Sequence, residues 1–112
     1  MKKEKWLNKK TLIMDKVFNK MSHSQEFFEM IKNSDNRQNI EFIIEFLMQA
    51  KKINEDEIFI DYILWLEDVL VNRNLEKNDF IFLLEKIKKI IFEFSEDEYV
   101  INLFDKSIQR VK

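Results

Sequence analysis

The sequence predicts an all-α protein, a compact single-domain bundle of about six helices spanning residues 1–112. Apolar residues recur at three- and four-residue spacing in every long segment, whereas strict alternation of apolar and polar residues is rare. At several places a Ser, Asp or Asn stands three residues before a Glu or Gln, which is the capping-box spacing of a helix N-terminus. The predicted connections have about two to six residues, so consecutive helices are expected to lie antiparallel.

The first two predicted helices lie before residue 33. The first spans about residues 4 to 21 and has an apolar side and a basic side. The apolar side carries Leu7, Met14, Val17, Phe18 and Met21. The basic side carries Lys2, Lys5, Lys9, Lys16 and Lys20. Ser22 is expected to open a short second helix, which ends in the polar residues 33–36 because their side chains favour turns.

The third and fourth predicted helices carry the most apolar part of the chain. Asp35 is expected to start the third helix, and its core face has Ile40, Ile43, Ile44 and Leu47. Asn54 is expected to start the fourth, whose apolar residues 58–71 form two adjacent stripes. The stripes are Phe59, Ile63, Leu66, Leu70 and Ile58, Tyr62, Trp65, Val69. Two stripes predict burial against more than one neighbour, so we expect this helix to be central.

The last two predicted helices follow a turn at residues 72–74. Asn74 is expected to adopt a left-handed conformation there, because Asn is the best substitute for Gly at a helix end. The fifth helix spans about residues 77 to 94, and Ser95 is expected to start the sixth. Their core positions are Phe80, Leu83, Leu84, Ile87, Ile91 and Phe94, then Val100, Leu103, Phe104, Ile108 and Val111.

The chain contains no Gly, no Pro and no Cys. Phosphate-binding loops, dinucleotide-binding turns, calcium loops and nucleophile elbows all use glycine, so these site types are disfavoured. Without cysteine there are no disulfides and no zinc–thiolate sites. The residues also offer no nucleophile–base pair, so we expect a protein that is not an enzyme and that needs no cofactor.

His23 is the only histidine, and Glu26 and Glu29 follow it at helical spacing. Di-iron bundles use paired Glu-x-x-His motifs, whereas here a single His comes before the acids, so a solvated His is the favoured interpretation.

Three carboxylates of the fourth helix, Glu57, Asp61 and Asp68, share one predicted face, where paired carboxylates can perform acid–base chemistry. No perturbing partner for them is evident in the sequence, so catalysis by this group is not favoured.

Apolar surface remains after a simple bundle is packed. Phe42, Phe46 and Phe82 lie off the main stripes of their helices, so we expect them to bind a protein partner or a second copy of the chain. Lys9 and Lys16 are expected to add charge complementarity to that contact.

Two alternatives stay open. The many aromatic residues could line a site for an apolar or planar ligand inside the bundle, as in a sensor. The basic first helix could bind nucleic acid or an anionic surface. Nucleic-acid binding is less favoured, because the bases are mostly Lys rather than Arg and no recognition helix is evident.

Charge and hydropathy bear on location and partners. The formal net charge is −2, so no strong global field attracts the chain to nucleic acid or membranes. The charge is nevertheless polarised, because bases dominate residues 1–20 and acids dominate residues 54–98. The N-terminus has no apolar stretch after its lysines, and no run of apolar residues has transmembrane length. A cytoplasmic location is therefore expected.

Residues 39–111 carry a further pattern. It consists of Phe59-Ile60-Asp61-Tyr62-Ile63-Leu64-Trp65-Leu66, then Val69-Leu70, Arg73 and the leucine-patterned residues 80–87. This pattern resembles a helical segment that precedes the cobalamin-binding module in some bacterial corrinoid-dependent regulators and corrinoid proteins. In that family Gly commonly follows the Arg, whereas this chain has Asn74.

The resemblance implies a sensory or regulatory accessory domain that packs on other helices. Cobalamin binding does not carry over, because the family binds it through an Asp-x-His-x-x-Gly motif in a separate α/β domain, and this chain has no Gly.

Overall fold

The computed structural model describes residues 10–24 and 34–112, and these residues form five α-helices. The helices are α2 (Lys10–Ser22), α4 (Ser34–Ile53), α5 (Asp56–Val71), α6 (Lys77–Ser95) and α7 (Glu98–Val111). No strand occurs in the two described ranges, and the predicted all-α class is confirmed. The count of about six differs by one, because the predicted short helix with Phe27 and Phe28 falls on residues 25–33, outside the described residues.

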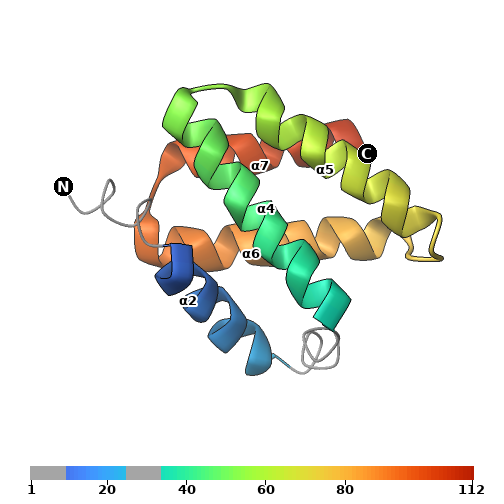
Figure 1. The fold of residues 1–112 in the computed structure, drawn as a ribbon, viewed down its shortest axis with the longest axis horizontal. Coiled ribbons are helices and arrows are strands. Elements are labelled where there is room, and N and C mark those ends of the chain that lie inside the picture. Colours follow the sequence, from blue (N-terminus) through green and yellow to red (C-terminus); the bar gives the residue numbers. More distant parts are fainter. Residues whose placement is uncertain (1–9, 25–33) are drawn as a thin grey trace.

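Two helix pairs and one further helix build the bundle (Figure 1). The helix α4 packs against α5, and α6 packs against α7. The helices α5 and α7 also pack against each other and so join the two pairs, whereas α5 and α6 touch little although they are consecutive. The helix α2 packs against α6 and α4. In Figure 1, α5 lies along the upper edge and α2 at the lower left, so these helices occupy different sides of the bundle.

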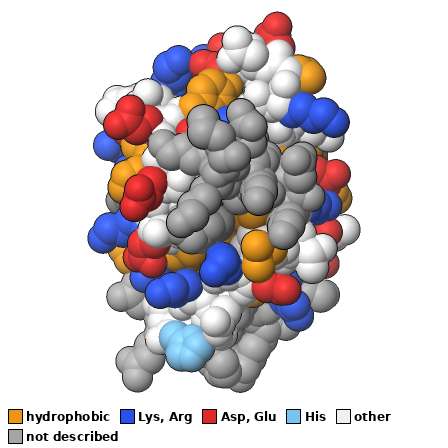
Figure 2. Space-filling view, turned by 90° about the vertical axis from the view of Figure 1, so that its left-hand side faces the viewer, with side chains coloured by type: hydrophobic (Ala, Val, Ile, Leu, Met, Phe, Trp, Pro, Cys, Tyr) orange, Lys and Arg blue, Asp and Glu red, His pale blue; other side chains and the backbone are white. Residues whose placement is uncertain are grey.

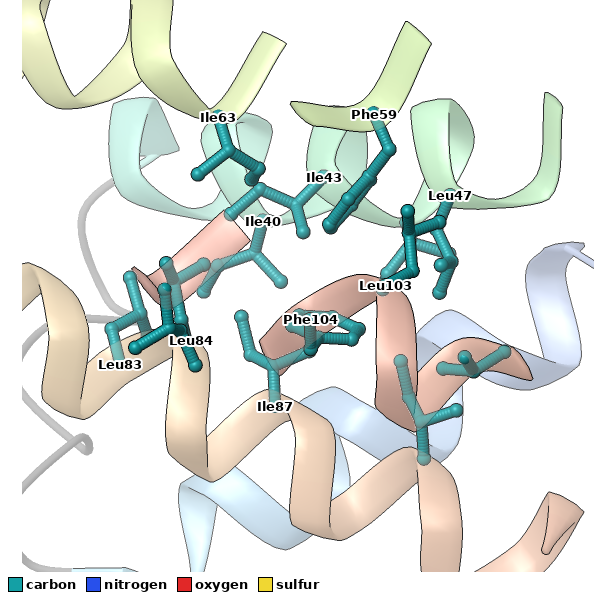
Figure 3. Packing of buried hydrophobic residues seen from close by; sticks show 14 of the residues in the cluster. Ile40, Ile43, Leu47, Phe59, Ile63, Leu83, Leu84, Ile87, Leu103 and Phe104 are labelled. Carbon is teal, nitrogen blue, oxygen red and sulfur yellow. The ribbon is translucent and has the colours of Figure 1, made fainter. Parts of the chain in front are cut away.

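All five helices contribute apolar side chains to one core. Figure 3 labels core residues of α4, α5, α6 and α7. At the centre of the core Phe59 of α5 and Phe104 of α7 meet edge to face, with ring centroids 5.1 Å apart and planes at 64°. The surrounding buried residues include Ile13, Val17, Ile40, Ile43, Ile44, Leu47, Ile63, Leu84, Ile87, Leu103 and Val111. The helical periodicity of the sequence therefore predicts the buried faces of α4 and α7 correctly, and that of α6 from Phe80 to Ile91. The predicted core position of Phe94 lies outside the described side chains.

The helix α5 buries one of its two apolar stripes. Phe59, Ile63 and Leu66 are buried between α4 and α7, as predicted for a helix with more than one neighbour. The second stripe reaches the surface, and its Trp65 is 59% exposed. Ile58 and Tyr62 of this stripe are partly buried against the core, so the exposed part of the stripe lies at Trp65. Although α5 is rich in apolar residues, none of the described helices is long and apolar enough to cross a membrane.

Each of the three connections from α4 to α7 contains one residue with positive φ. Asn74 has φ 72°, so the predicted left-handed turn is confirmed. Asn54 has φ 57° and Glu96 has φ 51°. A left-handed conformation lets the chain leave a helix and reverse direction, and Asn adopts it more readily than most residues.

Two of the predicted helix starts, Asn54 and Ser95, are wrong for related reasons. Asn54 ends α4 in its left-handed conformation, so Glu55 becomes the residue that precedes α5. Ser95 is the last residue of α6, and the side chain of Asp97 caps α7 by accepting a hydrogen bond from the Tyr99 amide. Ser22 is the last residue of α2, and the helix that it is predicted to open lies outside the described residues. In such short connections, the residue nearest the first helix completes that helix and cannot cap the next.

Candidate interaction surface

Aromatic rings from α4 and α5 line up on the outside of this helix pair. Phe46 and Tyr62 stack with ring centroids 4.3 Å apart and planes within 8°. Trp65 follows one turn along α5, with its ring centroid 5.8 Å from that of Tyr62. Phe42 lies one turn before Phe46 on α4 and is 38% exposed. We call Phe42, Phe46, Tyr62 and Trp65 the aromatic strip.

The strip is uncharged at ordinary pH although it contains a titratable group. Tyr62 is half-buried, and this burial raises its pKa to about 12. The neutral phenol is therefore the form present when a partner approaches. An uncharged aromatic surface with one ring exposed by more than half suits association with another apolar surface.

Two acidic side chains of α5 lie beside Trp65 of the strip: Asp61, four residues before it, and Asp68, three residues after it. The helix α5 contains five acids and no Lys or Arg, as its sequence DEIFIDYILWLEDVLV shows. Asp61 and Asp68 are exposed, and in the described part of the chain neither carboxylate lies within ion-pair distance of a basic group. Asp68 also lies in the last turn of α5, where a negative charge opposes the helix dipole.

Phe82 lies apart from the strip. It belongs to α6, which touches α5 little, and it is 51% exposed. Lys86 and Lys89 follow it by four and seven residues, so the three side chains share one side of α6. The predicted contact residues Phe42, Phe46 and Phe82 therefore belong to two separate surfaces.

Four lysines are associated with the side of the bundle that α2 and α6 form. Lys16 and Lys20 belong to α2, and Lys20 reaches Glu93 of α6 at 3.5 Å. We call Lys16, Lys20, Lys86 and Lys89, together with Phe82, the basic face. The predicted contact residue Lys16 is exposed on this face, and Lys9 lies outside the described residues.

Figure 2 shows the side of the bundle that lies at the left in Figure 1, where α2 is also found. Its described basic and acidic side chains are interspersed, with apolar side chains scattered among them. A mixed surface of this kind is typical of a solvated side of a protein.

The sequence predicts half of the strip. It predicts Phe42 and Phe46 as contact residues and assigns Tyr62 and Trp65 to burial. One sequence signal could have indicated that part of the Tyr62 and Trp65 stripe is exposed. The apolar surface of α5 is wider than two packed neighbours cover.

A polar cluster joins the ends of α4, α5 and α7. The Tyr99 hydroxyl donates to Asp56 Oδ1 at 2.6 Å, and Lys106 Nζ donates to Asp56 Oδ2 at 2.9 Å. Lys51 of α4 pairs with Asp97, the N-cap of α7. The hydrogen bonds from Tyr99 and Lys106 lower the pKa of Asp56, whereas burial and the bond to Asp56 raise the pKa of Tyr99. These groups bind one another and so hold three helix ends together.

His23 and the carboxylates of α5 that the sequence singled out do not form a site in the described part of the chain. His23 is exposed and its Nδ1 lies 2.7 Å from the Asn19 carbonyl oxygen, while Glu26 and Glu29 lie outside the described residues. In the described ranges no three His, Asp or Glu side chains are arranged to hold a metal ion. Glu57, 3.9 Å from Arg110, is exposed like Asp61 and Asp68.

The aromatic residues are divided between the core and the surface. Phe59, Phe80 and Phe104 are fully buried in the packed core, whereas Phe42, Trp65, Phe82 and Phe92 reach solvent. The grooves found on the described residues are open ones, such as that between α6 and α7 beside Phe92.

Comparison of the chain with family models, with curated proteins and with solved structures gives no match. The resemblance to the helical segment of corrinoid-dependent regulators therefore stays a prediction. The structure defines the chain as an all-α helical bundle.

Proposed function

We propose that this chain is a non-catalytic interaction module that binds another protein chain through the aromatic strip. The observation that carries the proposal is the position of Trp65, which continues the Phe46–Tyr62 stack and is 59% exposed. Trp and Tyr are enriched among the residues that dominate binding energy at protein interfaces.

The strip is already ordered before a partner arrives. Phe46 and Tyr62 both pack against the core, and their stacked rings fix the surface beside Trp65. Binding to an ordered surface costs less side-chain entropy than binding to a mobile one. Covering the exposed part of Trp65 and of Phe42 then removes apolar area from water, at about 25 cal/mol for each Å².

A non-catalytic role fits the chemistry of the strip and its surroundings. Phe42, Phe46 and Trp65 carry no titratable group, and Tyr62 is held neutral. The polar groups that do meet, such as Tyr99, Asp56 and Lys106, hold the ends of helices together.

The proposal is tested by comparing the native complexes of two variants with that of the wild type. Trp65→Ala removes the exposed ring, and Val71→Ala removes a 40% exposed side chain at the end of the same helix. Each chain is expressed at natural abundance, recovered under native conditions and analysed for mass and composition. We expect a complex for the wild type and for Val71→Ala, and its loss for Trp65→Ala.

Two outcomes contradict the proposal. One is a wild-type chain that is monomeric and has no associated protein. The other is a complex that Trp65→Ala leaves intact although the variant is folded by circular dichroism.

A further inference from the structure

We infer that the chain that covers the aromatic strip is a second copy of this protein, bound through its basic face. Copies then associate head to tail. This inference rests on the proposed function, since it names the partner of the same strip.

The charge around the strip favours a basic partner. Of the five acids of α5, Asp56 pairs with Lys106 and Glu57 with Arg110 of α7. Asp61 and Asp68 find no basic group within ion-pair distance in the described part of the chain. Asp68 lies at the negative end of the helix dipole, so its charge is unfavourable in the isolated bundle. A lysine from another chain would compensate both the carboxylate and the helix end.

The basic face offers the complementary chemistry. Phe82 is 51% exposed, and Lys86 and Lys89 share its side of α6. Lys86 and Lys89 have no ion pair with the described residues. Lys16 of the neighbouring α2 adds positive charge to this side, whereas Lys20 is paired with Glu93 of α6 at 3.5 Å. An aromatic ring among lysines thus matches an aromatic strip beside aspartates, and such complementarity sets the partner and the orientation of a contact.

A symmetric contact of two strips is less favourable. It would bring Asp61 and Asp68 of one copy towards the same residues of the other, and like charges at an interface are repulsive. The head-to-tail contact replaces this repulsion by attraction.

The two surfaces belong to different helices. The strip lies on α4 and α5, whereas the basic face lies on α2 and α6, and Figure 1 places α5 and α2 on different sides of the bundle. One copy can therefore use both surfaces at the same time. A contact between two different surfaces produces rings or open chains rather than a closed pair.

The inference is tested on the purified chain by light scattering at rising protein concentration. We compare the wild type, Trp65→Ala, Phe82→Ala and, as the control, Val71→Ala. We expect the mass of the wild type and of Val71→Ala to rise beyond that of a dimer, and each of the other variants alone to stay monomeric. Loss of a dominant interface aromatic corresponds to at least about thirtyfold weaker association.

Mixing the two defective variants gives the decisive measurement. Trp65→Ala keeps an intact basic face and Phe82→Ala keeps an intact strip, so an equimolar mixture is expected to form a one-to-one dimer and nothing larger. Higher salt should weaken this dimer, because ions screen exposed charges.

Each other outcome is informative. If Phe82→Ala alone still dimerises, the strip pairs with itself and the head-to-tail inference is overturned. If the purified wild type is monomeric while its native complex depends on Trp65, a different protein covers the strip; the inference is overturned and the proposed function stands. A monomeric wild type with no complex that depends on Trp65 overturns both.

Discussion

Phe46 of α4 and Tyr62 of α5 stack face to face, with ring centroids 4.3 Å apart and planes within 8°. This stack closes the outer edge of the α4–α5 pair, and Tyr62 also lies 5.8 Å from Trp65. The ring of Tyr62 therefore lies between the packed Phe46 and the exposed Trp65. The binding surface is thus an extension of the packing between two helices, and its geometry depends on the fold.

We expect Tyr62 and Tyr99 of the folded chain to ionise at a higher pH than a free tyrosine does. Burial raises the pKa of Tyr62 from its ordinary 10.0 to about 12, and Tyr99 is also raised. A raised folded-state pKa gives stability that is present below about pH 10 and is lost as the pH rises towards 12. Absorbance of tyrosinate measures this directly. In the Tyr62→Phe variant the remaining tyrosinate absorbance belongs to Tyr99, so the two residues can be distinguished. If both tyrosines of the folded wild type ionised near pH 10, the expectation would be refuted.

The Asp56–Tyr99 hydrogen bond is expected to stabilise the junction of α5 and α7. A hydrogen bond to a charged group contributes about 1.5–3 kcal/mol, and partial exposure reduces this to about 1–2 kcal/mol for Tyr99→Phe. Urea unfolding of Asp56→Asn, Tyr99→Phe and the double variant gives the coupling energy. Additive losses would show that the two groups do not interact.

The lowered pKa of Asp56 also predicts an acid effect. Its carboxylate contributes stability above the ordinary value of 3.8, and this stability is lost as the pH falls through the lowered value. As the pH falls below 3.8, Asp56→Asn is therefore expected to lose less stability than the wild type. Urea unfolding at a series of acidic pH values measures this difference, and equal losses for the two chains would contradict it.

Replacing a core aromatic residue by Ala is expected to lower the free energy of unfolding much more than replacing a surface aromatic residue. Phe104 is fully buried against Phe59, so Phe104→Ala should lower the free energy of unfolding by about 3–5 kcal/mol. Trp65 is mostly exposed, so Trp65→Ala should cost less than about 1.5 kcal/mol in the monomer. Urea unfolding in dilute solution compares the two. Equal losses would mean that Trp65 belongs to the core.

A glycine is expected to stabilise the α6–α7 connection. Glu96 adopts φ 51°, a conformation that costs a residue with a Cβ about 1–2 kcal/mol. Glu96→Gly removes this cost, but glycine also makes the unfolded chain more flexible, which offsets part of the gain. The free energy of unfolding is therefore expected to rise by about 0.5–1 kcal/mol. The control Gln109→Gly, at an exposed helical position of α7, should instead lose about 1 kcal/mol. A loss at both positions would contradict the left-handed assignment.

The sequence predicts the core well because burial follows helical geometry. Ile40, Ile43 and Leu47 recur on one side of α4, and only one side can face the core. The helix starts were harder to predict. Asn54 satisfies a capping-box spacing and also favours a left-handed conformation, and the length of the connection decides between the two roles.

The strip could be predicted only in part. Phe42 and Phe46 lie off the apolar stripe of α4 and so indicate surface. Tyr62 and Trp65 belong to a stripe as apolar as the buried one, and which stripe of α5 is covered depends on how α4 and α7 pack around it. This packing is a property of the whole bundle, which local periodicity does not contain.

The most direct test of the central claim is the accessibility of Trp65 itself. In Trp6→Phe the remaining tryptophan is Trp65, and acrylamide quenching of its fluorescence reports its exposure to solvent. We predict strong quenching in dilute solution and weak quenching, with blue-shifted emission, at concentrations where light scattering shows assembly. Equal quenching in both states would contradict the claim that another chain covers the aromatic strip.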